Sequence, residues 1–590
     1  MKFVQCILFV ALIFCANTAA GQWTNCTLEN GGFESWSGGE PEDWELIPSI
    51  DPSECTNTSF IGTTADAPSG RTALLLSGDR NTCRWLSPLQ NLIGVSPGDV
   101  FRLSGMIKTI DVDPKGQRSR NCQIYAVALD STGQRCGYFG TSPVYGTSDW
   151  IDYETVFQIP RNTVKIQVGV FLSLPGTALF DDLTLEKLEP PVAMAQWSRA
   201  ERWQADIDYM LELLEAFHPD PFAATTRELF MEKAGDLKNR INSLEDPDLI
   251  WGMRELLCSL GDSHTGCGVP KGALEKLPFR VGFFEEEIRV VATTSPYADL
   301  LGTQITGIDD KPLVAILEGI RPQIAYTHLN WFREQAPGWL VMPRALYGLS
   351  LIDSPEELNL TVLAADNQEI TNRIEFADPE TDSDALPDWV EAGPPEDKRP
   401  LYRRQNRFYW FEYLPAANTL YMKYDRCRDD QQRPLRQFGV ELVKVMDNQP
   451  IDRFVLDVRD NSGGSNIING LFSDLAKRVA DGRIGQTFVI TGRRTYSAAV
   501  YDADAMRQRT GAIVVGEPTG MAPVHPGRVN AFSLPGSGLE FFCSTRMVKA
   551  SEDNSPALMP DVMVEVSWDD FLAGHDPVLA AVLAYKRPKQ

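Results

Sequence analysis

The first part of the chain alternates hydrophobic and polar residues in short runs. Segments 123–130, 150–159 and 164–174 read QIYAVALD, WIDYETVFQI and VKIQVGVFLSL, and turn residues separate them. A two-residue period of this kind is typical of half-buried β-strands. No long helical period interrupts it, so we predict an all-β sandwich over 21–188. The paired prolines of LEPPVAMAQ then favour a linker.

Beyond this linker the hydrophobic period becomes helical. The runs ERWQADIDYMLELLEAF, TRELFMEKAGDLKNRINSL and DPDLIWGMRELLCSL place apolar residues three and four positions apart, and Gly261 ends the third run. We therefore predict a helical subdomain over 197–275. Strand-like runs such as FRVGFF and IRVVATT follow it and predict a β segment over 276–375.

The rest of the chain opens with an acidic, proline-rich stretch, which predicts an exposed linker over 376–400. After it, strand-like runs such as TLYMKYD, RFVLDVRD and TFVIT alternate with helical ones. This alternation is typical of βαβ units, so we predict a layered α/β core over 401–590. The predicted fold class is thus multidomain, with an all-β part, a helical part and an α/β core.

The first twenty residues have the pattern of an export signal. Lys2 supplies the positive start, ILFVALIF the short apolar core and ANTAAG the small-residue end. We therefore expect residues 1–20 to be removed and the protein to be secreted or periplasmic. Nine of the eleven cysteines follow this segment, and the odd number predicts at least one free or intermolecular thiol. No later stretch is long and apolar enough to cross a bilayer.

Charge and composition exclude two classes of function. The formal net charge of −25 repels phosphate backbones, so we expect no nucleic-acid partner. The chain has five histidines and contains neither C-x-x-C nor H-E-x-x-H, which argues against a zinc site. The candidate chemistry therefore has to come from other side chains.

Ser497, in TYSAAV, stands between a strand-like run and a helical run. The unpaired N–H groups of a helix's first turn can stabilise a developing negative charge, which suits a nucleophile there. Serine is also among the best helix N-caps. Val500 rather than Glu or Gln follows three residues later, so no capping box supports that role, and Thr495 offers a rival cap. Both interpretations of Ser497 remain open on these grounds.

A second candidate is the turn in LDVRDNSGGSN, which follows a strand of buried type. Gly463 and Gly464 allow the backbone to approach a substrate closely, and consecutive N–H groups there can bind an anion. A plain tight turn is the alternative.

A third candidate is LGDSHTG, in which His264 lies just beyond a helix end. A serine hydroxyl needs a base to take its proton, and histidine is the usual base at neutral pH. His264 could instead be satisfied by carbonyl groups at the helix end. His525 is the next candidate for the base. A Ser–Lys pair is less favoured, because no lysine follows Ser497 until Lys549.

These motifs, in this order, resemble a known superfamily. ELLEAFHPDPF, LGDSHTG, LLGTQITGIDDKPL, FVLDVRDNSGG, TYSAAV, VVGEPTG and MPDVMVEVSWDDFLAGHDPVLAAVL extend from about 200 to 585. The chain is similar here to the tail-specific, or C-terminal-processing, serine peptidases, and more so to their tricorn-core-like branch. The resemblance implies that Ser497 is the nucleophile and His264 the base, with Ser263 as an auxiliary hydroxyl.

The same resemblance implies further roles. The N–H of Gly463 or Gly464 and that of Ala498 would form the oxyanion hole. Glu552 would be the acidic residue that orients the site, with Asp553 as its rival, and no cofactor would be needed for catalysis. LLGTQITGIDDKPLVAI resembles the ligand groove of a PDZ-type domain, which binds peptides by strand addition.

The segment 21–188 resembles the jelly rolls of carbohydrate-binding modules, through ENGGFESW, EPEDWEL, GTSDWIDYETVFQIP and FDDLTLE. This resemblance implies a structural calcium, for which Glu34 and Asp182 could supply oxygen ligands, and a glycan as a partner. The tryptophans could stack on sugar rings or fill the sandwich core. They are Trp36, Trp44, Trp85 and Trp150.

Together these features predict an exported serine-type endopeptidase that acts on a peptide or protein. A non-catalytic peptide- or glycan-binding protein on the same fold is the alternative, and an esterase is a third interpretation. Three arginines, Arg493, Arg494 and Arg546, could bind a substrate carboxylate or form surface ion pairs.

Overall fold

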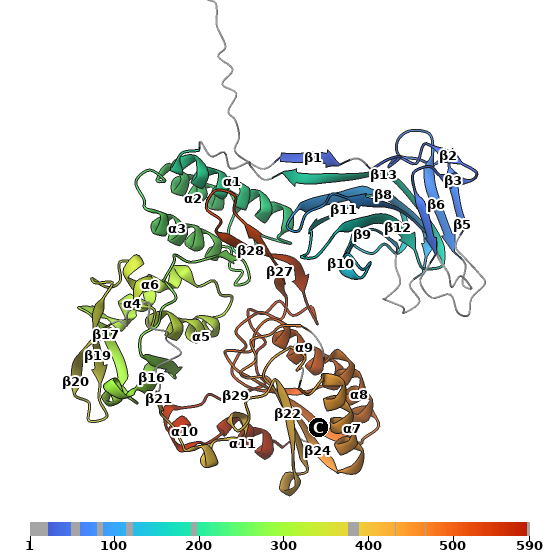
Figure 1. Ribbon diagram of the computed structural model, residues 1–590. Coiled ribbons are helices and arrows are strands. Elements are labelled where there is room, and N and C mark those ends of the chain that lie inside the picture. Colours follow the sequence, from blue (N-terminus) through green and yellow to red (C-terminus); the bar gives the residue numbers. More distant parts are fainter. Residues whose placement is uncertain are drawn as a thin grey trace, which may run out of the picture. The chain divides into compact units, whose positions relative to one another are not determined.

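The computed structural model describes residues 22–26, 28–48, 60–78, 86–113, 122–189, 197–375, 389–430, 432–465 and 468–586 (Figure 1). The expected signal peptide, Cys55, Cys83 and Trp85 lie outside these residues. The chain divides into two compact units. Unit 1 contains the described residues up to Phe217 together with Phe532–Gly538, and unit 2 contains His218–Ala531 and the described residues from Leu539 onward.

Unit 1 contains two antiparallel sheets. The first has the order β11-β8-β13-β6-β5, with β1 added to β13, and the second has the order β10-β9-β12-β7-β4. Inward residues of both sheets form one core, because side chains alternate between the faces of a strand. The strands are β1 (Gln22–Cys26), β4 (Glu45–Pro48), β5 (Phe60–Thr64), β6 (Ala73–Gly78), β7 (Leu86–Ile93), β8 (Val100–Val112), β9 (Cys122–Leu129), β10 (Arg135–Gly140), β11 (Gly146–Gln158), β12 (Lys165–Leu172) and β13 (Gly176–Glu189), with the short pair β2 (Trp36–Ser37) and β3 (Glu40–Pro41).

Helix α1 (Arg199–Phe217) also belongs to unit 1. Its Asp206 is fully buried, and the carboxylate accepts hydrogen bonds from the backbone N–H groups of Gly536 (2.6 Å) and Ser537 (2.8 Å). Unit 1 is therefore built from two separate stretches of the chain.

Unit 2 begins with helices and an antiparallel sheet of its own. Its sheet has the order β15-β16-β17-β19-β20, with β18 on β17 and β21 on β16. Strand β21 lies within the stretch predicted as a linker. The elements are α2 (Arg227–Asn239), α3 (Asp246–Cys258), β15 (Phe279–Phe284), β16 (Glu287–Thr294), β17 (Gln304–Ile308), β18 (Lys311–Pro312), α4 (Leu313–Ile320), α5 (Leu329–Leu340), α6 (Pro343–Gly348), β19 (Glu357–Leu363), β20 (Glu369–Glu375) and β21 (Trp389–Glu391).

The rest of unit 2 contains a six-stranded sheet of order β22-β23-β24-β25-β26-β29, parallel from β23 onward. Three further strands form a small sheet of order β14-β28-β27. The elements are β14 (Gly266–Cys267), β22 (Tyr409–Leu414), β23 (Thr419–Tyr424), α7 (Leu435–Asn448), β24 (Ile451–Asp457), α8 (Asn469–Ala480), β25 (Ile484–Thr491), α9 (Ala498–Thr510), β26 (Ile513–Gly516), β27 (His525–Ser533), β28 (Glu540–Val548), β29 (Val562–Met563), α10 (Trp568–Ala573) and α11 (Pro577–Ala584).

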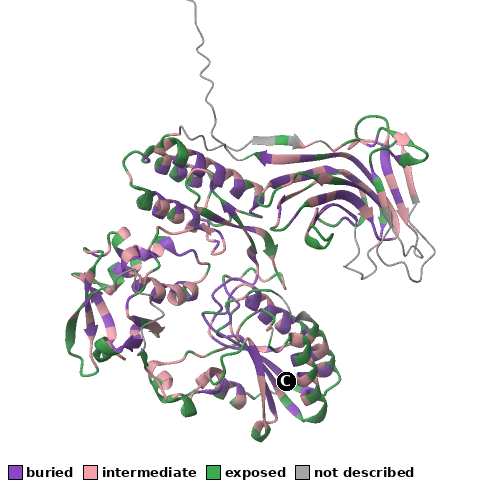
Figure 2. Ribbon diagram, viewed as in Figure 1, coloured by how far each residue is buried: buried purple, intermediate pink, exposed green. Residues whose placement is uncertain are grey.

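Both faces of the parallel sheet are covered. Phe454 and Leu456 of β24 pack into a core with α7, α8 and α9, whereas Val455 between them packs with α11 on the other face. Figure 2 shows the resulting concentration of buried residues in the central strands. Strands buried on both sides are typical of parallel sheets with crossover helices, which is the layered α/β arrangement that the sequence predicts.

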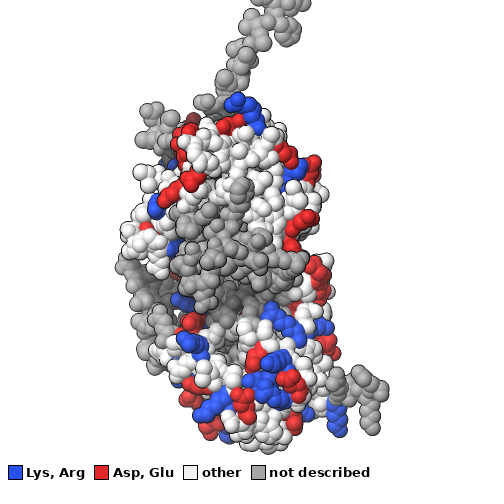
Figure 3. All heavy atoms as spheres, turned by 90° about the vertical axis from the view of Figure 1, so that its right-hand side faces the viewer, with Lys and Arg blue, Asp and Glu red and all other residues white. Residues whose placement is uncertain are grey.

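The finer domain boundaries predicted from the sequence are not resolved by the two-unit division and stay predictions. So do the PDZ-type groove and the export signal. The cysteines within the described ranges are all free thiols. None of the described helices combines the length and apolar character needed to span a membrane. On the face seen in Figure 3, basic and acidic groups are interspersed over the described surface.

Candidate active site

Ser497 lies at the start of α9, but it does not cap the helix. Its side chain makes no capping hydrogen bond to the first turn. Its backbone has φ +52° and ψ −124°, a conformation that costs a residue with a side chain about 1–3 kcal/mol. Strain of this kind persists only where the surrounding structure enforces it, and it is concentrated at functional turns. The helix-cap interpretation of Ser497 is therefore wrong.

His264 meets Ser497 across a separation of 233 residues. The Nε2 atom of His264 lies 3.0 Å from the Oγ atom of Ser497. With the imidazole proton on Nδ1, Nε2 accepts the hydrogen bond from the serine hydroxyl. This is the contact that a general base needs in order to take the proton of a nucleophile.

Burial keeps the His264 ring neutral. Desolvation lowers its pKa below the usual 6.5, while the charge of Asp262 and the nearby Pro526 carbonyl act in the opposite direction. The buried Nδ1 atom has no hydrogen-bond partner among the described residues. The Pro526 carbonyl therefore raises the pKa of the ring without forming a hydrogen bond of acceptable geometry. A neutral imidazole at pH 7 is the state in which His264 can accept a proton.

Asp262 fixes the loop that carries His264. Helix α3 ends at Cys258, the chain turns at Gly261, and Asp262 Oδ1 accepts the backbone N–H of His264 at 2.9 Å. Its other oxygen accepts the hydroxyls of Thr265 and Ser544, each at 2.6 Å.

His218 completes the surroundings of Asp262. Its Nε2 lies 3.1 Å from Asp262 Oδ2, while its Nδ1 accepts the N–H of Asp220. Nε2 therefore carries the proton and donates it to the carboxylate. Burial raises the pKa of Asp262, but the hydrogen bonds from His218, Ser544, Thr265 and the His264 backbone outweigh burial and hold the pKa below its ordinary value. Asp262 is thus an anion at neutral pH.

The glycine turn lies against Ser497. Strands β24 and β25 are parallel neighbours, so the turns after their carboxyl ends meet at one edge of the sheet. The Asn461 carbonyl accepts the Tyr496 N–H at 3.0 Å. A Cβ atom on Gly463 would lie 2.8 Å from the Cβ of Ser497, and Gly463 has φ +95°, so this position requires glycine.

The N–H groups of the two glycines expected at the oxyanion hole differ in whether they already donate a hydrogen bond. The Gly463 N–H already donates to the Asn461 side chain at 2.9 Å. The neighbouring bridge to Cys427 uses the Gly463 carbonyl and the Ser465 N–H, and the Gly464 N–H donates to no described residue. Gly464 is therefore the better candidate of the two glycines. Ala498 is the first residue of α9, next to the nucleophile.

Ser263 does not contact the serine–histidine pair directly. Its Oγ lies 2.7 Å from the hydroxyl of Tyr496, whose ring lies 4.9 Å from that of His264 and stacks on Trp331 at 4.0 Å. Tyr496 thus contacts both the auxiliary hydroxyl and the imidazole. Burial raises the pKa of Tyr496, so its hydroxyl is neutral.

Glu552 is not brought to the pair. Its side chain is 83% exposed, and its carboxylate pairs with Lys549, three residues away, at 2.7 Å. Asp553, the rival, accepts a hydrogen bond from the Ser555 N–H in the same loop. The local ion pair holds Glu552 toward solvent. In the described structure the carboxylate nearest to the His264 ring is that of Asp262, whose Oδ1 lies 3.9 Å from His264 Nδ1.

His525 takes a supporting place beside the base. Its ring stacks on His264 with 6.0 Å between centroids, and its Nδ1 lies 2.8 Å from the Ala522 carbonyl. Burial chiefly lowers the pKa of His525 to about 4, so this ring is also neutral. His264 rather than His525 contacts Ser497.

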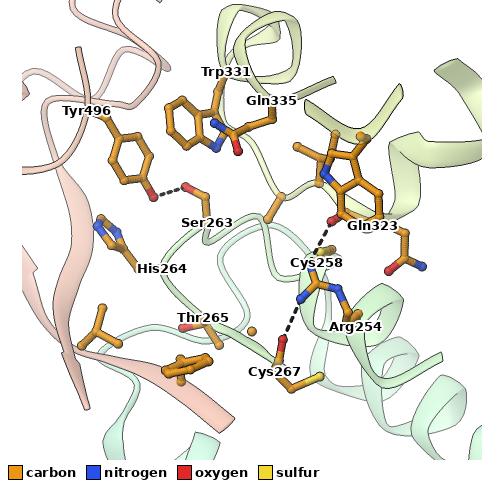
Figure 4. Close-up of a pocket in the computed structure, with 16 residues that line it drawn as sticks. Arg254, Cys258, Ser263, His264, Thr265, Cys267, Gln323, Trp331, Gln335 and Tyr496 are labelled. Carbon is orange, nitrogen blue, oxygen red and sulfur yellow. Dashed lines mark hydrogen bonds between the residues drawn. The ribbon is translucent and has the colours of Figure 1, made fainter. Parts of the chain in front are cut away.

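A cavity of about 450 Å³ opens beside the imidazole (Figure 4). His264, Ser263 and Tyr496 line one part of it, and Trp331 and Trp339 contribute aromatic surface. A volume of this size admits an amino-acid side chain with part of its backbone.

The calcium expectation in unit 1 has weak support. One oxygen of Glu34 accepts the N–H groups of Arg71 and Thr72, and Asp182 accepts the hydroxyl of Ser69. Asp181 Oδ2 is buried and has no hydrogen-bond partner among the described residues, and burial raises the pKa of that carboxyl to about 6. Within the described ranges no group of three or more His, Cys, Asp or Glu side chains has the arrangement of a metal site.

The tryptophans expected at a sugar surface are partly used by the fold. Trp44 is buried against Phe33, and its Nε1 donates to the Asn30 carbonyl. Trp36 Nε1 donates to the Phe33 carbonyl at 2.6 Å. Trp150 is hydrogen-bonded to Asp66 at 3.3 Å. Trp44 therefore belongs to the core, as one of the two interpretations expects.

Sequence reasoning did not identify Asp262, His218 or Ser544 as supports of the site. Asp262 stands two residues before His264 in the motif that was singled out, which is a local signal. Its contacts with His218 and Ser544 join positions 44 and 282 residues away, and no sequence period indicates such contacts.

Comparison with known proteins gives structural similarities alone. No family model and no curated protein sequence matches this chain. Mature CPAF complexed with lactacystin is similar with a TM-score of 0.49 and 11% identity, over 65% of this chain and 98% of that chain. The photosystem II D1 C-terminal processing protease is similar with a TM-score of 0.33 and 12% identity, over 65% of this chain and 99% of that chain.

The first unit has its own similarity. The CBM22-1 xylan-binding domain from Paenibacillus barcinonensis Xyn10C is similar with a TM-score of 0.20 and 14% identity, over 29% of this chain and 97% of that domain. TM-scores below 0.5 at such identities decide nothing about function. The chain is thus similar in structure to proteases and to a sugar-binding domain, and its function has to be argued from the geometry of Ser497 and His264.

Proposed function

We propose that this protein is an exported serine peptidase in which Ser497 is the nucleophile and His264 the general base. The observation that carries the proposal is the 3.0 Å contact between His264 Nε2 and Ser497 Oγ. The strained backbone of Ser497 and the adjacent glycine turn support it. Both features are expected where a hydroxyl must be held exposed next to backbone donors.

The proposed reaction proceeds by acyl transfer. His264 Nε2 takes the hydroxyl proton as Ser497 Oγ attacks the peptide carbonyl, and the N–H groups of Gly464 and Ala498 stabilise the oxyanion. The imidazolium then gives its proton to the leaving amine, and the C–N bond breaks. Water, deprotonated by His264, attacks the acyl-enzyme and releases the acid, which restores Ser497. Asp262 favours the imidazolium through its negative charge.

A second candidate is a binding protein without turnover. It is favoured by the absence of a carboxylate hydrogen-bonded to His264 Nδ1 within the described structure, and by the exposed position of Glu552. A peptidase-like site that lacks this partner could hold a peptide and not cleave it.

Covalent labelling separates the two candidates. We expect a fluorophosphonate reagent to modify Ser497, and the protein to hydrolyse activated peptide substrates. Ser497→Ala should lose labelling and turnover with an unchanged melting temperature, whereas Ser243→Ala, at an exposed serine between α2 and α3, should keep both. A protein that binds peptides but is neither labelled nor active would establish the second candidate.

Export is the remaining part of the proposal. It rests on the apolar and small-residue pattern of residues 1–20. Amino-terminal sequencing of the secreted or periplasmic protein should find a chain that begins near residue 21. A mature chain that retains Met1 inside the cell would refute this part and leave the catalytic proposal intact.

A further inference from the structure

The cavity beside His264 has an unusual charge for this protein. The chain as a whole carries a formal charge of −25, and acidic residues exceed basic ones by 80 to 55. Yet none of the sixteen described residues that line the cavity is Asp or Glu, and Arg254 is the lining residue with a permanent charge. The cavity is therefore a local positive site within an acidic protein.

Arg254, on α3, has more donors than acceptors. Its Nη1 donates to the Cys267 carbonyl at 2.6 Å, and its Nη2 lies 3.5 Å from the Gln323 carbonyl. A guanidinium has five N–H groups, so at least three have no acceptor among the described residues, and the buried Nε is one of them. No described carboxylate forms an ion pair with Arg254.

The neighbouring thiols do not compensate this charge. Cys258 and Cys267 line the same cavity. Burial raises the pKa of Cys258 to about 11 and that of Cys267 to about 12, although Arg254 acts to lower both. Both thiols are neutral at pH 7. The partly buried Arg254 cation therefore has two carbonyl groups and the Trp339 ring, 5.6 Å from its Cζ, but no anion among the described residues. Such a charge is costly unless a ligand pairs with it.

Figure 4 shows how the ends of the cavity differ. His264, Ser263 and Tyr496 lie on one side, and Arg254 lies on the other with Gln323, Cys258 and Cys267 around it. The buried Oε1 atom of Gln323 also has no described hydrogen-bond partner. A ligand that fills the space would thus meet the Arg254 cation at one end and the His264 ring, which contacts Ser497, at the other.

We propose that this cavity is a specificity subsite that binds a substrate carboxylate through Arg254. The carboxylate belongs either to an acidic side chain near the scissile bond or to the free C-terminus of the peptide. The inference rests on the proposed peptidase function, because it places the bound residue next to Ser497 and His264. Arg493, a candidate from the sequence, already pairs with Glu517 at 2.6 Å.

Matched peptides test the inference. One series carries Glu or Gln at each position around the cleaved bond, with an amidated C-terminus, and a second compares free with amidated C-termini in a neutral peptide. We expect either the Glu side chain or the free C-terminus to raise kcat/KM at least about tenfold over the matched neutral peptide. An effect of this size is typical of hydrogen bonds to a charged group. The arm that shows this preference identifies the source of the carboxylate.

Variants assign the preference to Arg254. Arg254→Met should abolish the preference, so that peptides with and without the carboxylate are cleaved at equal rates, and Arg254→Lys should keep part of it. Arg373→Met is the matched control, since Arg373 is an exposed arginine of β20 outside the cavity, and it should change nothing. The inference is overturned if the unmodified protein cleaves Glu and Gln peptides at equal rates and also cleaves peptides with free and amidated C-termini at equal rates. This outcome does not depend on whether a variant folds.

The design separates this inference from the proposed function. Labelling of Ser497 and cleavage without a carboxylate preference would refute the subsite and leave the peptidase. Without labelling or cleavage, fluorescence anisotropy with the same labelled peptides still decides the inference. Tighter binding of the carboxylate peptides that disappears in Arg254→Met supports the subsite, and equal binding refutes it.

Discussion

At the scale of single residues, Ser497 shows how a backbone conformation can distinguish two roles of the same side chain. A capping serine has an extended backbone and bonds the first helical turn. Ser497 has neither property, and its Oγ lies next to an imidazole. The base in turn depends on burial for its neutral state and on Asp262 for its position.

The protonation of His264 predicts the pH dependence of activity. Burial lowers its pKa below 6.5, so the protonated, inactive form appears on acidification alone. We expect kcat/KM to reach a plateau at alkaline pH and to fall on acidification with the uptake of one proton, with a midpoint below pH 6.5. A pH profile with a neutral peptide substrate measures this, and an acidic limb centred above pH 7 would contradict it.

Asp262 should tune this profile as a positioning residue. Its charge raises the pKa of His264, so Asp262→Asn should move the acidic limb of kcat/KM to lower pH. The variant should also lose about 1–3 kcal/mol of stability, because the donors around a buried carboxylate lose an acceptor. A limb that moves to higher pH would contradict the proposed electrostatic role.

Several residue roles could be proposed from sequence, and others could not. Ser497 and His264 each lie in a short motif at the boundary of a predicted element, so local pattern made them candidates, and the resemblance to the peptidase superfamily implied their roles. The Glu552 assignment depended on distance along the chain from a motif, and the loop instead turns it to Lys549. Arg254 carries no sequence signal, since the lack of a described carboxylate beside it depends on side chains from separate elements.

At the scale of elements, the site depends on two parallel strands whose following turns meet. The continuous apolar run of β24 and the helical periods after it were enough to predict a βαβ unit, because these patterns are local. The contact between the turns follows from the order of strands, which hydrophobic periods do not encode. The place of β28 next to β14 is likewise a long-range pairing that no local pattern predicts.

Substitution of Gly463 tests how closely the two turns approach each other. Gly463→Ala puts a Cβ 2.8 Å from Ser497 Cβ at φ +95°, so we expect a loss of about 1–3 kcal/mol and of most activity. Gly439→Ala in α7 is the matched control, because its Cβ would meet nothing within 4 Å. It should stabilise the protein by about 0.5–1 kcal/mol. Thermal denaturation compares the two, and a harmless Gly463→Ala would contradict the close approach.

At the scale of the whole molecule, unit 1 is discontinuous in sequence. Its sandwich and α1 precede unit 2 along the chain, and Phe532–Gly538 returns to it from the connection between β27 and β28. Composition and period indicate the sandwich but give no sign that a segment more than 300 residues later belongs with it. The second stretch is fastened through the buried carboxylate of Asp206.

Asp206 therefore predicts a coupled loss of order. Asp206→Ala leaves the N–H groups of Gly536 and Ser537 without their acceptor, at a cost of about 1–3 kcal/mol. Hydrogen exchange should become faster at 532–538 and in α1, with the strands of the sandwich unaffected. Exchange that is unchanged at 532–538 would show that the carboxylate does not fasten this segment.

At the left-handed backbone of Ser497, the residue that would be most stable differs from the residue that the proposed reaction requires. Glycine adopts φ +52° without the penalty that a side chain meets. Ser497→Gly should therefore melt at a higher temperature than the natural chain while being catalytically inert. A search for heat-resistant variants that ignores activity would therefore favour this substitution and would select a catalytically inert protein.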